Sequence, residues 1–309
     1  MATILNLFDR RRRDRAPAGD MAALLQGWSI EVLPRTAAKI ERFADLLPEG
    51  CRVYVAHVDG TPIDAMVETA KRIAAEGFPV MPHVPARSVP SRAALAEWLG
   101  RYRDEAGVDQ ALAIAGGRPE PVGAFSDSMQ LLDTGLFEAS GFRRIHVAGH
   151  PEGARQIDPD GGDAAAMAAL RWKQDWAEAA GVEMAVATQF CFEAAPVVDW
   201  ARRLRAAGVR LPVHIGVAGP ARLQTLIKYA MLCGVGPSLK VLQKRAADIS
   251  RLMLPFTPEE VLRDLAAEKA RDPALQIERV HFFPLGGVPQ TAEFCDAAGR
   301  PVGGVAARA

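Results

Sequence analysis

From Ser29 onward, short apolar runs rich in β-branched residues alternate with longer segments rich in Ala, Arg and Glu that have a helical period. This alternation is typical of βα units built around a parallel sheet. Eight apolar runs are predicted to be strands: Ser29–Leu33, Val53–Val58, Val80–Val84, Ala111–Ala115, Ile145–Ala148, Ala185–Gln189, Val213–Val217 and Val280–Leu285. Eight βα units in about 280 residues match an α/β fold of the (β/α)8 TIM-barrel type in both number and length.

The segments that separate the strands are predicted to be helices. These are Ala37–Leu47, Ile63–Glu76, Ser91–Ala106, Ser126–Ser140, Ala164–Ala180, Ala195–Ala207, Arg222–Cys233 and Pro258–Lys269. A further helical stretch, Ser238–Leu254, precedes the last of these helices and is interpreted as an insertion. Because no Pro/Ser-rich linker or internal repeat divides the chain, we expect a single barrel domain over residues 28–309, preceded by an N-terminal extension over residues 1–27.

The charge balance and the cysteines restrict the class of protein. Lys plus Arg and Asp plus Glu both number 37, so no net charge favours nucleic acid or an anionic membrane. The one dense charge run, Asp9 to Arg15, is interpreted as a solvated segment or a subunit contact. No apolar run reaches the roughly 18 residues that span a bilayer, no signal peptide is evident, and the four cysteines are far apart. We expect a soluble cytoplasmic protein with a small-molecule substrate, and homo-oligomerisation stays open.

Polar residues close several of the predicted strands, where a TIM barrel builds its active site. His57 and His83 end the second and third strands, and His150 follows the fifth. Three histidines at strand ends could hold a metal ion, but no H-x-H or H-E-x-x-H spacing accompanies them, so no metal site is predicted. The absence of G-x-G-x-x-G between strand and helix, and of P-loop or nucleophile-elbow motifs, argues against Rossmann dehydrogenases, P-loop NTPases and α/β-hydrolases.

Two of these polar residues suggest specific chemistry. Glu31 lies within an apolar strand, where burial would raise the pKa of its carboxyl and suit a general acid near neutrality. The alternative is an ion pair with a buried arginine. Gln189 closes the sixth strand, and an amide that donates and accepts at once suits the mixed edge of a pterin. It could equally be a core amide that the backbone satisfies.

Six segments, in order along most of the chain, match the motifs of one enzyme family. Two of them, Ser29-Ile-Glu-Val-Leu-Pro-Arg35 and Ala187-Thr-Gln-Phe-Cys-Phe-Glu193, resemble the S-F-E-F-F-P-P-R opening and the I-T-Q-x-F-F-D signature of methylenetetrahydrofolate reductases. The other four matches are Pro82-His83 with P-H, Val147–Gly153 with V-A-x-Y-P-E, His214–Val217 with P-G-I, and Val280–Leu285 with H-F-Y-T-L.

The resemblance implies a folate-dependent oxidoreductase of one-carbon metabolism and methionine biosynthesis. Glu31 would protonate methylenetetrahydrofolate, and a hydride that originates from NAD(P)H would convert it to methyltetrahydrofolate, or the reverse in a demethylation pathway. The resemblance implies the substrate-binding residues Gln189, Phe190, Leu223 and Gly117. It implies the FAD-binding residues Ala56, His57, His83, Ala115, Gly116, His150 and Lys173.

The chain departs from the family at the positions that handle the flavin. Where the family has R-G-D after the fourth strand, this chain has Ala115, Gly116 and Gly117. The family's basic pair falls on Trp176-Ala177, with Lys173 one turn earlier. Because phosphates need cationic partners, FAD is expected to bind weakly or not at all, and the hydride could pass directly from nicotinamide to folate. A pterin-dependent methyltransferase and a non-catalytic folate-binding barrel are the alternatives.

Overall fold

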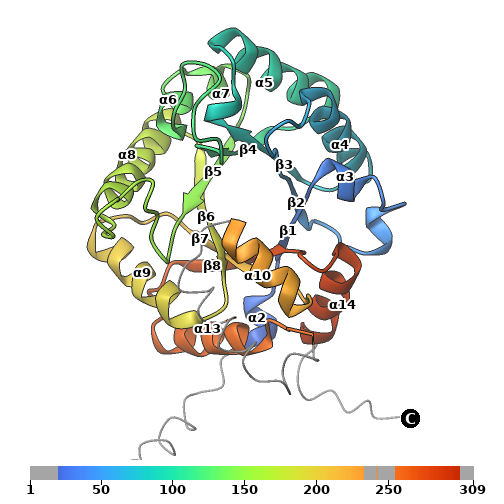
Figure 1. Ribbon diagram of the computed structural model, residues 1–309, viewed down its shortest axis with the longest axis vertical. Helices are drawn as coiled ribbons and strands as arrows, with labels where there is room; N and C mark the ends of the chain where they lie inside the picture. Colours follow the sequence, from blue (N-terminus) through green and yellow to red (C-terminus); the bar gives the residue numbers. More distant parts are fainter. Residues whose placement is uncertain (1–19, 233–241, 243–254, 300–309) are drawn as a thin grey trace, which may run out of the picture.

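The computed structural model describes residues 20–232, 242 and 255–299, and its centre is a closed barrel of eight parallel strands in chain order (Figure 1). The barrel closes because β1 pairs with both β2 and β8. The strands are β1 Ser29–Val32, β2 Arg52–Val55, β3 Val80–Pro85, β4 Gln110–Ile114, β5 Arg144–Gly149, β6 Glu183–Cys191, β7 Val213–Ala218 and β8 Ile277–Phe283. The predicted (β/α)8 barrel is therefore confirmed.

Helices form a ring outside the strands (Figure 1). They are α2 Met21–Leu24, α3 Pro34–Ala37, α4 Ile63–Ala75, α5 Arg92–Ala106, α6 Ser128–Leu132, α7 Leu136–Ala139, α8 Ala164–Ala180, α9 Ala194–Ala206, α10 Leu223–Leu232, α13 Glu259–Arg271 and α14 Val288–Ala298, with the 3₁₀ helices η1 Phe43–Asp45 and η2 Ala86–Ser88. The α5 helix shows why the sequence sets these bounds. The Ser91 hydroxyl accepts from Ala94 N at 3.1 Å to cap its start, and Gly107, at φ 65°, ends it.

Two predicted helices are each replaced by shorter pieces. The segment 37–47 forms no continuous helix, because the chain leaves α3 after one turn. Arg72 Nη2 donates to the carbonyl oxygens of Ala37 and Ile40 at 2.6 and 3.1 Å, and Ile40 N also donates to Ala37 O. The segment 126–140 is divided into α6 and α7 at Gly135, whose φ of 67° an L residue rarely adopts.

The last helix that the structure describes was not expected from the sequence. The α14 helix follows β8, and Pro289 stands in its first turn, where its missing N–H has no cost. The predicted insertion over 238–254 lies outside the described residues except for Leu242, which is buried. Of the proposed extension over 1–27, the described part contains α2, whose Leu24 packs in the main core beside Trp28. The boundary at residue 28 stays a prediction.

The two faces of the strands have different characters. Residues that point outward, such as Ile30, Val53 and Val84, form the apolar core between strands and helices. The interior of the barrel also buries polar rings, those of Tyr54, His146, His214 and His281. TIM-barrel interiors are dominated by branched aliphatic side chains, so this interior is unusually polar. It leads directly to the candidate site at the carboxyl ends of the strands.

Candidate active site

Glu31 lies at the carboxyl end of β1 between two histidines from other strands. Because strand side chains alternate between the two faces, Glu31 shares the inner face of β1 with Ser29. Glu31 Oε2 is 3.3 Å from His83 Nε2 and 3.9 Å from His281 Nε2. The other nitrogen of His281, Nδ1, is 2.9 Å from Ser29 Oγ. His83 Nε2 is buried and makes no hydrogen bond of regular geometry. The carboxylate and two imidazoles therefore form one cluster.

The two imidazoles reverse the expected direction of the pKa shift of Glu31. Burial by itself raises the pKa of this carboxyl, but His281 and His83 outweigh that effect and hold it at about 2. Burial lowers the pKa of His281, partly offset by Glu31. The expectation of a raised carboxyl pKa is therefore wrong for the free protein, because it considered burial without the imidazoles.

Tyr54 forms the floor beneath this cluster. Its ring centroid is 4.2 Å from that of His281, and its hydroxyl is 2.6 Å from His146 Nδ1. The His146 ring meets His214 edge to face with centroids 4.7 Å apart. Burial lowers the pKa of both His146 and His214, which favours their neutral forms.

Gln189 lies on a β-bulge at the end of β6. The pairing of β6 with β7 shifts register between Ala187 and Phe190, and such bulges commonly aim side chains near active sites. Gln189 Oε1 accepts from Phe190 N at 3.1 Å, whereas Nε2 has no hydrogen-bond partner among the described residues. The carboxamide is half-buried and turns its oxygen toward its own main chain.

Phe190 and Leu223, the two apolar residues predicted to bind substrate, lie in one buried cluster. Phe190 packs edge to face against Phe192 and Phe283, with ring centroids 5.6 and 5.4 Å apart, and Leu223 begins α10 in the same cluster. Both are buried, at 2% and 5% exposure. The structure brings the two residues together, but in the protein interior, where other protein atoms already cover both side chains.

Lys173 of α8 is a buried cation near the end of β5. It is 8% exposed, and no ion pair or hydrogen bond involves it within the described part of the chain. Burial lowers its pKa to about 8, and the Asp127 carboxylate offsets this only in part. His150 is close enough for Lys173 to lower its pKa further, after the larger effect of burial. An unpaired buried ammonium is costly to keep.

The ends of β2 and β4 hold the remaining predicted residues. Ala56 is buried, and His57 Nε2 lies 2.9 Å from Thr61 O with its ring against Trp98, so His57 supports its own loop. Gly116 has φ 91°, and a Cβ there would lie 2.9 Å from Pro85 Cβ.

The glycine loop after β4 is framed by an ion pair. Ala115 is half-buried, whereas Gly117 is exposed and has open space around it. Arg118 pairs with Asp59 across the two loops. A negative group near Ala115 would have to draw Arg118 away from this partner.

Ser29, Tyr54 and His281 are site residues that the sequence prediction missed. His281 lies early in the predicted eighth strand and not at its end. The period of two in Ser29-Ile-Glu31 and in His281-Phe-Phe283 would have placed each pair on the inner face of its strand. The two-residue alternation does not show which strands lie close enough for their side chains to meet.

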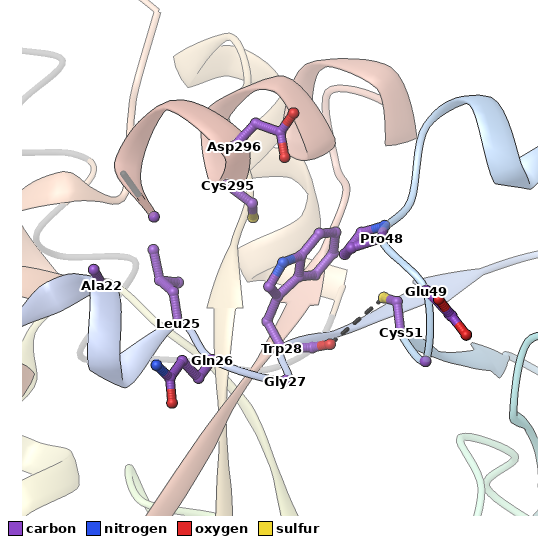
Figure 2. Close-up of a pocket in the computed structure, with 12 residues that line it drawn as sticks. Ala22, Leu25, Gln26, Gly27, Trp28, Pro48, Glu49, Cys51, Cys295 and Asp296 are labelled. Atoms are coloured by element: carbon purple, nitrogen blue, oxygen red, sulfur yellow. Dashed lines mark hydrogen bonds between the residues drawn. The ribbon is translucent and has the colours of Figure 1, made fainter. Parts of the chain in front are cut away.

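Two cavities occur away from this cluster. One, of about 450 Å³, lies at the amino ends of β1 and β2, where Trp28 stands between Leu25 and Pro48, with Cys51 and Cys295 on the walls (Figure 2). The other, of about 440 Å³, lies beside Arg203 of α9. Neither includes Glu31. Within residues 20–232, 242 and 255–299, no group of three His, Cys, Asp or Glu side chains is arranged to hold a metal ion, and no helix is long and apolar enough to span a membrane.

Comparison with known proteins adds little about function. No protein-family model matches the chain. It is similar to the 7,8-dihydropteroate synthase from Vibrio fischeri ES114, with 12% identity, coverage of 89% of this chain and 93% of that chain, and a TM-score of 0.43. It is also similar to the 3-dehydroquinate dehydratase from Aquifex aeolicus VF5, with 8% identity, coverage of 87% and 97%, and a TM-score of 0.42. Similarities this weak say nothing about the substrate or the reaction. The assignment of the fold as a barrel rests on the strand order of the protein itself.

Proposed function

We propose that the protein is a folate-dependent oxidoreductase that interconverts 5,10-methylenetetrahydrofolate and 5-methyltetrahydrofolate. The observation that carries the proposal is the cluster of Glu31 with His83 and His281 at the carboxyl end of the barrel. A half-buried carboxylate that lies beside two imidazoles can accept and deliver a single proton. The sequence resemblance supplies the reaction to which such a proton belongs.

The proton chemistry follows from the cluster. Protonation of the bridging nitrogen of methylenetetrahydrofolate breaks the ring C–N bond and leaves an iminium at the one-carbon unit. A hydride from the nicotinamide, passed directly or through a flavin, then completes the methyl group. Because the Glu31 pKa is about 2 in the free protein, Glu31 begins as a carboxylate and has to take up a proton before it can act as the acid. A ligand that covers the cluster would strip water from Glu31 and raise its proton affinity.

The amide of Gln189 is the second element of the proposal. A pterin carries carbonyl and ring-nitrogen acceptors along one edge, and Gln189 Nε2 is a donor without a partner among the described residues. Phe190 and Leu223 lie in the buried apolar cluster behind this strand end and support it from within the protein. Orientation of the pterin ring relative to the hydride donor would supply much of the rate acceleration.

The residues fit FAD only in part. Lys173, buried and without an ion pair, can hold one phosphate, and His150 lies near it. Ala115 and Gly117 provide no charge where a second contact would be needed, and Arg118 is already paired with Asp59. We therefore propose that flavin, whose chemistry is hydride relay, binds below one equivalent, and that a visible absorption spectrum of the purified protein will show this.

The deciding experiment measures nicotinamide oxidation when methylenetetrahydrofolate is added to the purified protein, with and without free FAD. Oxidation coupled to formation of methyltetrahydrofolate supports the reductase. Pterin binding without nicotinamide oxidation would instead support a pterin-dependent methyltransferase, which the missing flavin contacts at Ala115 and Gly117 favour. If no pterin binds, the function proposed here is wrong.

A further inference from the structure

Two hydrogen bonds of the Thr188 side chain hold the bulge in β6, and we call this pair of bonds the latch. Thr188 is 2% exposed, and its Oγ1 accepts from Gly216 N of β7 at 2.8 Å while donating to Gln189 O at 2.9 Å. One hydroxyl therefore joins the neighbouring strand to the main chain of the residue that carries the predicted ligand amide. Buried side-chain to main-chain bonds of this kind fix irregular backbone that a regular ladder would otherwise straighten.

Gly216 is the second part of the latch. A Cβ at this position would lie 2.4 Å from Thr188 O and 2.8 Å from Gln189 O, which is closer than real Cβ atoms approach. The close approach of β7 to the bulge therefore requires a glycine. The lack of a side chain lets Gly216 N reach the Thr188 hydroxyl.

The latch determines which group of Gln189 faces outward. With the bulge fixed, Phe190 N lies 3.1 Å from Gln189 Oε1 and holds the oxygen against the main chain. A main-chain N–H can only donate, so the assignment of oxygen to this side of the carboxamide is required chemically. The amino group is then the group presented on the other side.

We propose that Thr188 and Gly216 are positioning residues that orient the Gln189 carboxamide, and that the ligand meeting Gln189 presents a hydrogen-bond acceptor to Nε2. That the ligand is a pterin rests on the proposed function, whereas the latch does not. The inference gives Gln189 a donor role at this site, narrower than the mixed donor and acceptor role that its residue type allows.

The latch is tested first without any ligand, by amide hydrogen exchange in the full-length protein. In Thr188→Val, which keeps the shape and loses the hydroxyl, the amides of Gly216 and Phe190 should exchange at least about tenfold faster. Thr188→Ser keeps the hydroxyl and should protect both. If Phe190 is equally protected in Thr188→Val and the parent, Thr188 does not orient Gln189 and the proposal is overturned.

The donor role is tested by calorimetric titration with 5-methyltetrahydrofolate. Gln189→Leu should bind about tenfold more weakly, and Gln189→Glu more weakly still, because its second oxygen would face the acceptor of the ligand. Thr188→Val should weaken binding about tenfold in the parent and not at all in the Gln189→Leu background. If Gln189→Glu binds as well as the parent, the ligand presents a donor and the inference is wrong. If the parent binds no pterin, the proposed function fails while the exchange result still decides the latch.

Discussion

The two ends of the barrel treat their polar groups differently. At the amino ends of the strands, charged side chains have partners on the next strand or beside them: Arg144 with Glu183, Arg143 with Asp109, and Arg279 with Glu278. At the carboxyl ends, Lys173 is buried and has no ion pair among the described residues, and Nε2 of His83 has only Glu31 Oε2 near it, at 3.3 Å. Charged groups are thus paired at the amino ends, whereas a buried cation lacks an ion pair at the carboxyl ends; neutral groups without a hydrogen bond, His214 Nδ1 and Gln276 Oε1, also lie at the amino ends.

The difference indicates where a ligand is needed. Buried polar groups in native proteins almost always have partners, and the exceptions gather where a ligand completes the set. The cavity at the amino end contrasts with this pattern, because its thiols Cys51 and Cys295 have pKa values raised by burial and are not poised to react. The following changes test whether this contrast holds.

The largest effect is expected from Glu31→Gln, which keeps size and hydrogen bonding but removes the transferable proton. Turnover with methylenetetrahydrofolate should fall at least about a hundredfold, close to 3 kcal/mol in the barrier, while the fold survives. Glu183→Gln is the matched control at the amino end and should leave turnover within about twofold. Steady-state kinetics on both variants decides this. Equal turnover in Glu31→Gln and the parent would remove Glu31 from the chemistry.

The fold and the candidate site differed in how far they could be predicted. Eight apolar runs and their spacing were sufficient for the barrel, because a parallel sheet of eight βα units has one common closure. Glu31 was found because a carboxylate in an apolar strand is conspicuous. The lowered pKa of Glu31 could not be predicted, because it depends on His83 and His281, which lie 52 and 250 residues away in sequence. α14 was missed because Gly287 and Pro289 resemble a loop.

A second test concerns acid stability. His146, His214 and His281 are buried, and burial lowers the pKa of each below its ordinary value. The unfolded chain then binds more protons below about pH 6.5, so the free energy of unfolding falls as the pH falls, by about 2 kcal/mol between pH 6.5 and 5.5. Glu31, whose pKa is lowered to about 2, adds a loss only below about pH 4.5. Urea unfolding at several pH values measures both.

A matched variant separates the histidines from general acid effects. His146→Gln keeps an acceptor for the Tyr54 hydroxyl, 2.6 Å away in the parent, and cannot be protonated near neutrality. Its unfolding free energy should fall less steeply with acidification than that of the parent. An identical slope would show that His146 is not held neutral by burial.

A smaller effect is expected from Lys173→Met. Because burial lowers the Lys173 pKa to about 8, its charge opposes folding, so the variant should be more stable by about 1 kcal/mol at pH 7. The folded pKa lies below the unfolded value, so the parent gains stability as the pH rises from about 8 to about 10.5, and the difference should vanish there. Lys71→Met, on the exposed face of α4, is the control and should change stability by less than about 0.5 kcal/mol. Thermal unfolding showing Lys173→Met below the parent would mean that Lys173 has a stabilising partner.

The smallest effect is expected at the amino ends of the strands. Arg144→Ala breaks an ion pair with Glu183, whose side chain is 69% exposed, so the free energy of unfolding should change by no more than about 0.5 kcal/mol. Ligand affinity at the other end should not change. A loss of affinity measured by calorimetry would show that the two ends are coupled through the barrel interior.

The central claim is that a folate binds at the carboxyl ends of the strands, and the six histidines of the chain can report it directly. In a ring-resolved NMR titration with 5-methyltetrahydrofolate, His83 and His281 flank Glu31, whereas His214 lies 3.8 Å from Glu278 at the opposite rim. The account predicts saturable shifts of the His83 and His281 ring signals and an unmoved His214. No saturable shift at His83 and His281, or a larger shift at His214, would contradict it.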